Sequence, residues 1–96
     1  MIYKITCKKC DWFVYIGETE RRLCDRIQQH RGYVTQKKFK EVCGEHFNLP
    51  GHSIADMVVV GIERVLPRGD KLIRTIREAY WINQYESCTF GANRQE

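Results

Sequence analysis

The sequence predicts an α+β domain in which helices flank a small three-stranded antiparallel sheet. Two strand-like runs lie close to the N-terminus with a short turn between them, and a β-branched run follows at residues 57–62. Two other segments carry apolar side chains at helical spacing. With 96 residues, 43% hydrophobic and 29% charged, the chain is expected to form a single domain over residues 1–96. A domain this small buries only a modest core, so a structural metal would add useful stability.

The first two strands are expected to form a hairpin. Residues 1–6 alternate apolar and polar side chains, as a half-buried strand does, and residues 12–16 are a β-prone run that ends at Gly17. The segment Cys-Lys-Lys-Cys-Asp at residues 7–11 then forms the turn.

The segment after the hairpin has the signals of a helix. Thr19 can cap a helix that runs from about residue 20 to residue 31, and Gly32 can end it. Leu23 and Ile27, four residues apart, would form its buried side.

The second half of the chain predicts a strand between two helices. A weaker helical candidate at residues 37–47 ends at the turn signal of residues 48–51. The run at 57–62 is apolar on both faces, which predicts a central strand, and residues 67–70 end it. Residues 71–85 predict a final helix packed on the sheet. One apolar face is made by Leu72, Ile76, Ala79 and Tyr80, and a neighbouring face is made by Trp81, Ile82 and Tyr85 around Glu78.

Charge and cysteine content restrict the class of protein. The net charge of +4 favours a polyanion such as nucleic acid as partner, although a solvated basic surface stays an alternative. No apolar run is long enough to span a membrane, so we expect a soluble intracellular protein without a membrane partner. Five cysteines without regular spacing argue for reduced thiols, some of them metal ligands, over a disulfide framework.

Four residues have the spacing of a structural zinc site. Cys7 and Cys10 are separated by two residues, so a tight turn lets both thiolates reach one Zn²⁺ ion, and His46 and His52 could complete the tetrahedron. Cys43 precedes His46 by three residues and is an alternative ligand.

Other residues have the chemistry that phosphodiester hydrolysis requires, which is a base, a cation and a metal. Tyr3 and Tyr15 supply phenols, and Arg26 can grip phosphate oxygens. His30 lies four residues after Arg26 and shares its helix face, while Glu78 offers the anionic oxygen that Mg²⁺ prefers.

The order of these residues resembles the GIY-YIG endonucleases. Ile2-Tyr3 and Tyr15-Ile16-Gly17 are similar to the two motifs that name the family, although Met1 stands where the first motif has glycine. The resemblance covers essentially the whole chain and implies that the catalytic residues are Tyr3, Tyr15, Arg26, His30, Glu78 and Asn93, the last within Gly91-Ala92-Asn93.

Within that family the chain is most similar to the endonuclease domain of Penelope-like retroelements. Their mark is two cysteines between the tyrosine motifs and two later histidines, and Cys7, Cys10, His46 and His52 stand in that pattern. The resemblance implies a structural Zn²⁺ site and DNA cleavage that depends on Mg²⁺ or Mn²⁺ bound by Glu78.

The resemblance also implies a biological setting. The domain would be excised from a larger protein whose reverse transcriptase domain is primed by the nicked DNA, and it would be nuclear in a eukaryotic retroelement. The main alternative is a catalytically silent, zinc-stapled nucleic-acid-binding module. A cysteine hydrolase that uses Cys24 or Cys88 is more distant, because neither thiol has an evident orienting partner in the sequence.

Overall fold

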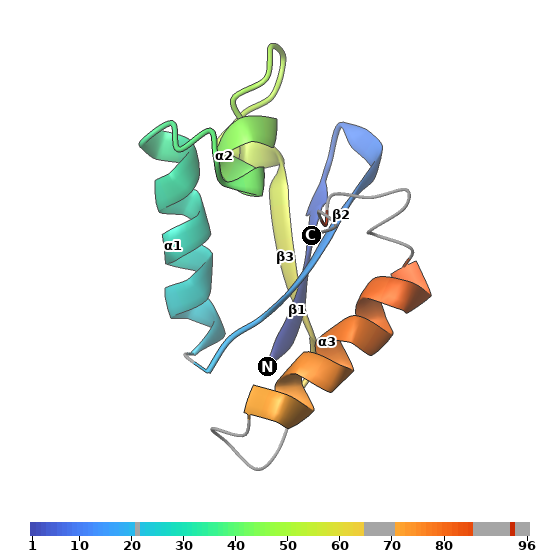
Figure 1. Ribbon diagram of the computed structural model, residues 1–96. Helices are drawn as coiled ribbons and strands as arrows, with labels where there is room; N and C mark the ends of the chain where they lie inside the picture. The colour runs from blue at the N-terminus through green and yellow to red at the C-terminus, as the bar shows by residue number, and fades with distance from the viewer. Residues whose placement is uncertain (21, 65–70, 86–92, 94–96) are drawn as a thin grey trace.

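A computed structural model of the chain describes residues 1–20, 22–64, 71–85 and 93, and shows an antiparallel three-stranded sheet between helices (Figure 1). The predicted α+β class is therefore confirmed. In chain order, the elements are β1 (Ile2–Cys7), β2 (Cys10–Glu18), α1 (Leu23–Thr35), α2 (Val42–His46), a short 3₁₀ helix (Ile54–Asp56), β3 (Met57–Glu63) and α3 (Lys71–Tyr85).

The predicted hairpin forms, and its first strand is the centre of the sheet. The strand order is β2-β1-β3, with both neighbours antiparallel to β1. The expectation that residues 57–62 form a central strand is wrong, because β3 lies at an edge. Its Val60 is 48% exposed, so the apolar run there reflects β propensity more than burial on two faces.

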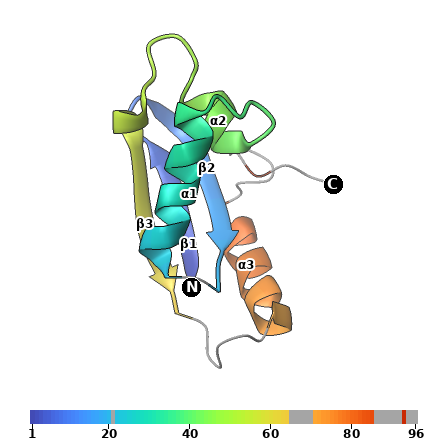
Figure 2. The same ribbon diagram turned by 90° about the vertical axis from the view of Figure 1, so that its left-hand side faces the viewer.

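Alternation along β1 divides the core between the two faces of the sheet. Tyr3, Ile5 and Cys7 point to the face that α1 and α2 cover. Ile2, like Ile16 of β2, points to the opposite face, which α3 covers. Figures 1 and 2 show α1 and α3 on opposite sides of the sheet. The larger of the two apolar clusters lies under α1 and α2.

Helix α1 starts and ends later than the sequence predicts. Thr19 does not cap it, because its backbone exchanges two hydrogen bonds with Met1, from Thr19 N–H to the Met1 carbonyl and from the Met1 amine to the Thr19 carbonyl. Arg22 is still extended, with φ of −60° and ψ of 144°, so the helix begins at Leu23. Gly32 lies within the helix, which continues because Val34 reaches the core.

Helix α2 is much shorter than the candidate at residues 37–47. The chain after α1 packs closely over it: a Cβ atom at Gly44 would lie 2.1 Å from the Lys38 carbonyl oxygen. Only glycine allows this approach, and the residues before Val42 are therefore held in a loop. The predicted turn at residues 48–51 is present, with Gly51 at a φ of 79°.

Helix α3 has the predicted bounds, but only one of its faces is buried. Ile73, Trp81 and Ile82 pack on Ile2 and Ile16. The predicted packing of its other apolar face is wrong, since three of its side chains are largely exposed: Leu72 (70%), Ile76 (57%) and Tyr80 (43%). None of the described helices has the length and hydropathy needed to cross a bilayer. The predicted turn at 67–70 lies outside the described residues, as does the C-terminal tail apart from Asn93.

Candidate active site and metal centre

Tyr3 is buried between two glycines. It pairs with Gly17 on β2 and with Gly61 on β3, and none of its surface is exposed. Its ring lies so close to Gly17 that a Cβ atom there would come within 2.4 Å of the ring and of the hydroxyl oxygen. Gly17 thus makes room for the tyrosine, which gives the glycine of the second motif a packing role.

The hydrogen bonds around Tyr3 indicate where its proton points. Arg26 has only donors, so its Nε–H donates to the Tyr3 hydroxyl oxygen over 2.9 Å. The hydroxyl also lies 2.8 Å from His30 Nε2, and His30 Nδ1 is buried without a partner among the described residues. If His30 donated to Tyr3, both Nδ1 and the phenol proton would lack partners. We therefore take Tyr3 to donate to His30, which leaves only Nδ1–H unsatisfied.

The pKa values agree with this direction. Burial raises the pKa of Tyr3 well above its usual value, in spite of the opposing charge of Arg26. Burial, reinforced by the charge of Arg26, lowers the pKa of His30 to about 4. At neutral pH the phenol is protonated and the imidazole is neutral, so a phenol donor and an imidazole acceptor face each other.

Tyr15 joins the same cluster from the neighbouring strand. It pairs with Ile5 and therefore points to the same face of the sheet as Tyr3, but it is only half-buried. Its ring meets the edge of His30 at 5.8 Å between centroids, and Tyr33 meets His30 from α1 at 5.6 Å. Burial raises the pKa of Tyr15. The predicted pair of tyrosines thus brackets one buried histidine.

Arg26 extends from this cluster towards solvent. Besides Tyr3, its guanidinium donates to the Gln29 side-chain oxygen, and a hydrogen bond to Tyr33 also contributes to the raised pKa of Arg26. Gln29 and Tyr33 were not among the predicted site residues. Their helical spacing from Arg26 and His30 was the only signal that the sequence offered for them.

Glu78 reaches the same region from α3. It is half-buried, and burial, followed by the negative charge of Glu18, raises its pKa, while Arg26 and Lys71 lower it. Its own charge raises the pKa of Tyr15. Arg26 and Glu78 come from helices on opposite faces of the sheet. Their charges interact past β2, which is an edge strand of that sheet.

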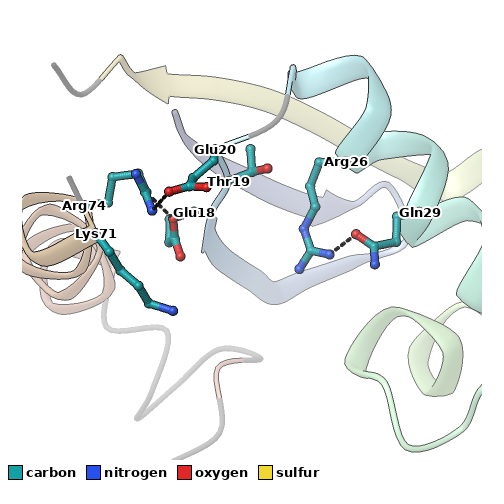
Figure 3. Close-up of a pocket in the computed structure, with 7 residues that line it drawn as sticks. All are labelled: Glu18, Thr19, Glu20, Arg26, Gln29, Lys71 and Arg74. Carbon is teal, nitrogen blue, oxygen red and sulfur yellow. Dashed lines mark hydrogen bonds and ion pairs between the residues drawn. The ribbon is translucent and has the colours of Figure 1, made fainter. Parts of the chain in front are cut away.

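A cleft of about 360 Å³ opens beside Arg26, which is the one predicted site residue among the described residues that line it (Figure 3). Its walls come from the end of β2 and the residues that follow it, from Arg26 and Gln29 of α1, and from Lys71 and Arg74 of α3. The cleft therefore joins α1 to α3 past the end of the strand that carries Tyr15.

Asn93 contacts β2 within the second tyrosine motif. Its Nδ2 donates to the Ile16 carbonyl over 2.9 Å, and its Oδ1 accepts from the Ile16 N–H over 2.8 Å. Ile16 lies between Tyr15 and Gly17 on an edge strand, so the amide takes the place of a further strand there. The catalytic role predicted for Asn93 stays a prediction, and Gly91 and Ala92 lie outside the described residues.

The four predicted zinc ligands converge at the other end of the hairpin. One ligand atom from each of Cys7, Cys10, His46 and His52 lies within 4.8 Å of the others. His46 Nε2 is buried without a hydrogen-bond partner in the described part of the chain. An unsatisfied imidazole nitrogen beside two thiols fits a metal ligand.

Groups around the cluster orient the ligands as a metal site requires. His52 Nδ1 is 3.2 Å from the Pro50 carbonyl oxygen, so Nδ1–H donates there and Nε2, 3.0 Å from Cys10 Sγ, is left free to bind a metal. The Lys9 N–H points at Cys7 Sγ over 3.4 Å, as a donor to a thiolate would. The donor set fits a tetrahedral site for a soft metal ion.

Among the described residues, the other two cysteines take no part in this cluster. Cys43 is not a member of it, and its thiol is 1% exposed in the core, where burial raises its pKa to about 12. Cys24 is exposed on α1, and its thiol donates to Asp25 Oδ1 over 3.9 Å; none of its hydrogen bonds within the described part of the chain is to a histidine. Cys88 lies outside the described residues.

Comparison with known proteins identifies the fold. No family model matches the chain, and no curated protein matches it. Among solved structures, the catalytic domain of homing endonuclease I-TevI matches with a TM-score of 0.78 over 99% of this chain and 97% of that one, at 20% sequence identity. The likeness confirms the predicted GIY-YIG nuclease-like fold, which the three-stranded sheet and its helices share.

Proposed function

We propose that this domain is a metal-dependent endonuclease that hydrolyses phosphodiester bonds in DNA. The observation that carries the proposal is the Tyr3 hydroxyl, which is hydrogen-bonded to His30 and to Arg26, a residue that lines the cleft. Support comes from the fold, which is that of the catalytic domain of an endonuclease.

The hydrogen bonds around Tyr3 suit a proton relay. A water that attacks phosphorus would pass a proton to the Tyr3 oxygen while Tyr3 passes its own proton to His30 Nε2. Arg26 stabilises negative charge on the phenol oxygen during this transfer, since its Nε–H already points there. A bound phosphate would raise the low pKa of His30 and so favour the transfer.

Access to Tyr3 requires Arg26 to respond to the substrate. Tyr3 has no exposed surface, whereas Arg26 and Tyr15 are half-exposed. We propose that a DNA phosphate draws the guanidinium of Arg26 outward and so opens the Tyr3 hydroxyl to the attacking water. Tyr15 would then orient that water from the neighbouring strand.

Glu78 is the proposed ligand of the catalytic metal. Its carboxylate is half-buried and lies close enough to Arg26 for their charges to interact. Mg²⁺ or Mn²⁺ held there would position the scissile phosphate and neutralise its developing charge. Arg26 would grip the same phosphate through its remaining N–H groups.

The cysteine and histidine cluster is proposed to hold a structural Zn²⁺. Two thiols and two imidazoles without an open position are typical of structural zinc sites. This set agrees with the resemblance to the Penelope-like endonucleases. On that resemblance we propose that the domain nicks DNA in the nucleus, and that the new 3′-hydroxyl primes a reverse transcriptase in the parent protein.

A nicking assay on supercoiled plasmid tests the proposed activity. With Mg²⁺ present, the zinc-loaded parent should nick the plasmid, while Glu78→Ala and Arg26→Ala should each lose at least about 100-fold in rate. Arg31→Ala is the matched control, because Arg31 is exposed on the same helix as Arg26. If both site variants nick as fast as Arg31→Ala, the assignment is wrong. Binding without cleavage by the parent would instead favour the silent nucleic-acid-binding module.

A further inference from the structure

A buried arginine ties α3 to the end of β2. Arg74 is 3% exposed; its Nε donates to Glu18 Oε2 and its Nη2 to Glu20 Oε1, each over 2.7 Å (Figure 3). Glu18 is the last residue of β2, and Glu20 lies in the connection to α1. These three residues, Glu18, Glu20 and Arg74, are called the Arg74 clasp below.

The Arg74 clasp holds two elements together at a cost in hydration free energy. Burying a guanidinium costs hydration energy that ion pairs offset only in part. The third nitrogen of Arg74, Nη1, is buried and has no partner among the described residues, which adds to the cost. An apolar side chain would pack α3 on the sheet more cheaply, as Ile73 does one residue earlier. The charge therefore calls for an explanation other than stability.

The position of the Arg74 clasp between two proposed site residues explains why a buried charge is present there. Arg74 and Glu78 are four residues apart on α3, so they lie one turn apart on the same face. Glu18 is at the end of the strand that carries Tyr15, and it acts electrostatically on Glu78. Arg74, Glu18 and Arg26 also line the same cleft. The clasp thus joins the strand of one site residue to the helix of another.

We propose that Arg74 is a positioning residue that fixes α3 against the end of β2, and so sets where Glu78, one turn further along α3, lies relative to Arg26 and Tyr15. The directional, two-pronged contact sets both the rotation and the height of the helix, which apolar packing alone leaves less defined. This inference rests on the proposed role of Glu78 as a metal ligand.

A second arginine on α3 offers a matched control. Arg77 makes a comparable link, since it donates to both Glu63 oxygens over 3.0 Å and so ties α3 to the end of β3. That link is on the other edge strand, away from the cleft. Arg74→Gln and Arg77→Gln each remove one arginine link between α3 and the sheet, but only Arg74 lines the cleft.

The test compares metal binding and nicking in zinc-loaded variants. Mn²⁺ alone is titrated by electron paramagnetic resonance, and the site is identified as the one lost in Glu78→Ala. Arg74→Gln should weaken Mn²⁺ binding, and raise the Mg²⁺ concentration for half-maximal nicking, by about 10-fold or more. Arg74→Lys should restore part of that loss. Arg77→Gln should lower the Tm while leaving both metal values within about twofold of the parent.

Two additional measurements keep the proposal testable on its own. Glu18→Gln breaks one ion pair at constant volume, and it should show the same metal defect if Arg74→Gln does not fold. In NMR spectra of the zinc-loaded proteins without Mg²⁺ or Mn²⁺, the amide signals of residues 15–18 and of Glu78 should move together in Arg74→Gln and stay in place in Arg77→Gln. Equal metal values in both arginine variants, or unmoved Glu78 signals, would overturn the proposal. A parent that neither binds Mn²⁺ at Glu78 nor nicks DNA would instead refute the proposed function, and the NMR comparison would still decide the role of Arg74.

Discussion

Tyr3 and His30 form a neutral pair in a place where neither group can ionise easily. Each is almost fully buried, and each has a pKa moved by burial away from the charged form. Arg26 adds the only charge that the described hydrogen bonds bring to the phenol, and it favours a phenolate over an imidazolium. Proton transfer from Tyr3 to His30 is therefore costly until an anion arrives, which would couple the chemistry to substrate binding.

The low pKa of His30 predicts that stability falls in mild acid. An unfolded histidine has a pKa of about 6.5, so the unfolded chain takes up a proton at higher pH than the folded protein does. Stability then decreases as the pH falls from about 6.5 towards about 4, and the part due to His30 should be roughly 2 kcal/mol between pH 7 and pH 5.

Urea unfolding of the parent and of His30→Gln at both pH values measures this contribution. The difference between the two proteins cancels the other titrating groups, including His46 and His52. The parent should lose more stability than the variant by the amount given above. Equal losses in both proteins would show that His30 is not held neutral by the fold.

At the scale of elements, the β1–β2 hairpin carries the proposed zinc site at one end and the tyrosines along its length. Cys7 and Cys10 face each other at the turn, and Phe13 of β2 stacks on His46 with 3.9 Å between ring centroids. A metal bound there would anchor the strands that hold Tyr3 and Tyr15 at the turn through two ligands, and to α2 through His46. The metal would fix the register of the tyrosines as well as the stability of the domain.

Loss of one ligand should accordingly destabilise the whole domain. Cys10→Ala is expected to lower the free energy of unfolding by at least about 3 kcal/mol, or roughly 12–24 °C in Tm for a domain of this size. Cys24→Ala, which removes an exposed thiol on α1, is the control and should change the Tm little.

Calorimetry with elemental analysis of both variants checks this expectation. The Cys24→Ala protein should retain about one zinc per chain, and the Cys10→Ala protein should lose it. An unchanged Tm on treatment with a chelator, or a parent purified without zinc that folds equally well, would rule out a structural metal.

At the scale of the whole molecule, local patterns predicted more than long-range ones. The hairpin and α3 were predicted because alternation and helical spacing act over a few residues. The start of α1 was missed because Thr19 bonds to Met1, a contact between strands that propensity does not reveal. The central place of β1 was missed for the same reason, since strand order depends on pairing between distant segments.

In the candidate site, too, local relationships were predicted and most long-range contacts were not. Arg26 and His30 were predicted to share a face of one helix, and they do share it around Tyr3. In the Arg74 clasp, Arg74 is 56 positions from Glu18 and 54 positions from Glu20 in the sequence. The amide of Asn93 contacts Ile16 across 77 positions. No local pattern marks such contacts. The convergence of Cys7, Cys10, His46 and His52 was predicted in spite of their separation because the cysteine spacing is itself a local signal.

The whole molecule brings α1, the end of β2 and α3 together around one cleft, and we propose that this arrangement cleaves DNA through Tyr3. The direct measurement is the single-turnover nicking rate of Tyr3→Phe at saturating Mg²⁺, with Tyr80→Phe, an exposed tyrosine on α3, as control. We predict a loss of about 10²–10⁴-fold for Tyr3→Phe, because the phenol oxygen is the first acceptor of the proton, and none for Tyr80→Phe. A folded Tyr3→Phe protein that nicks within about twofold of the parent rate would contradict the account.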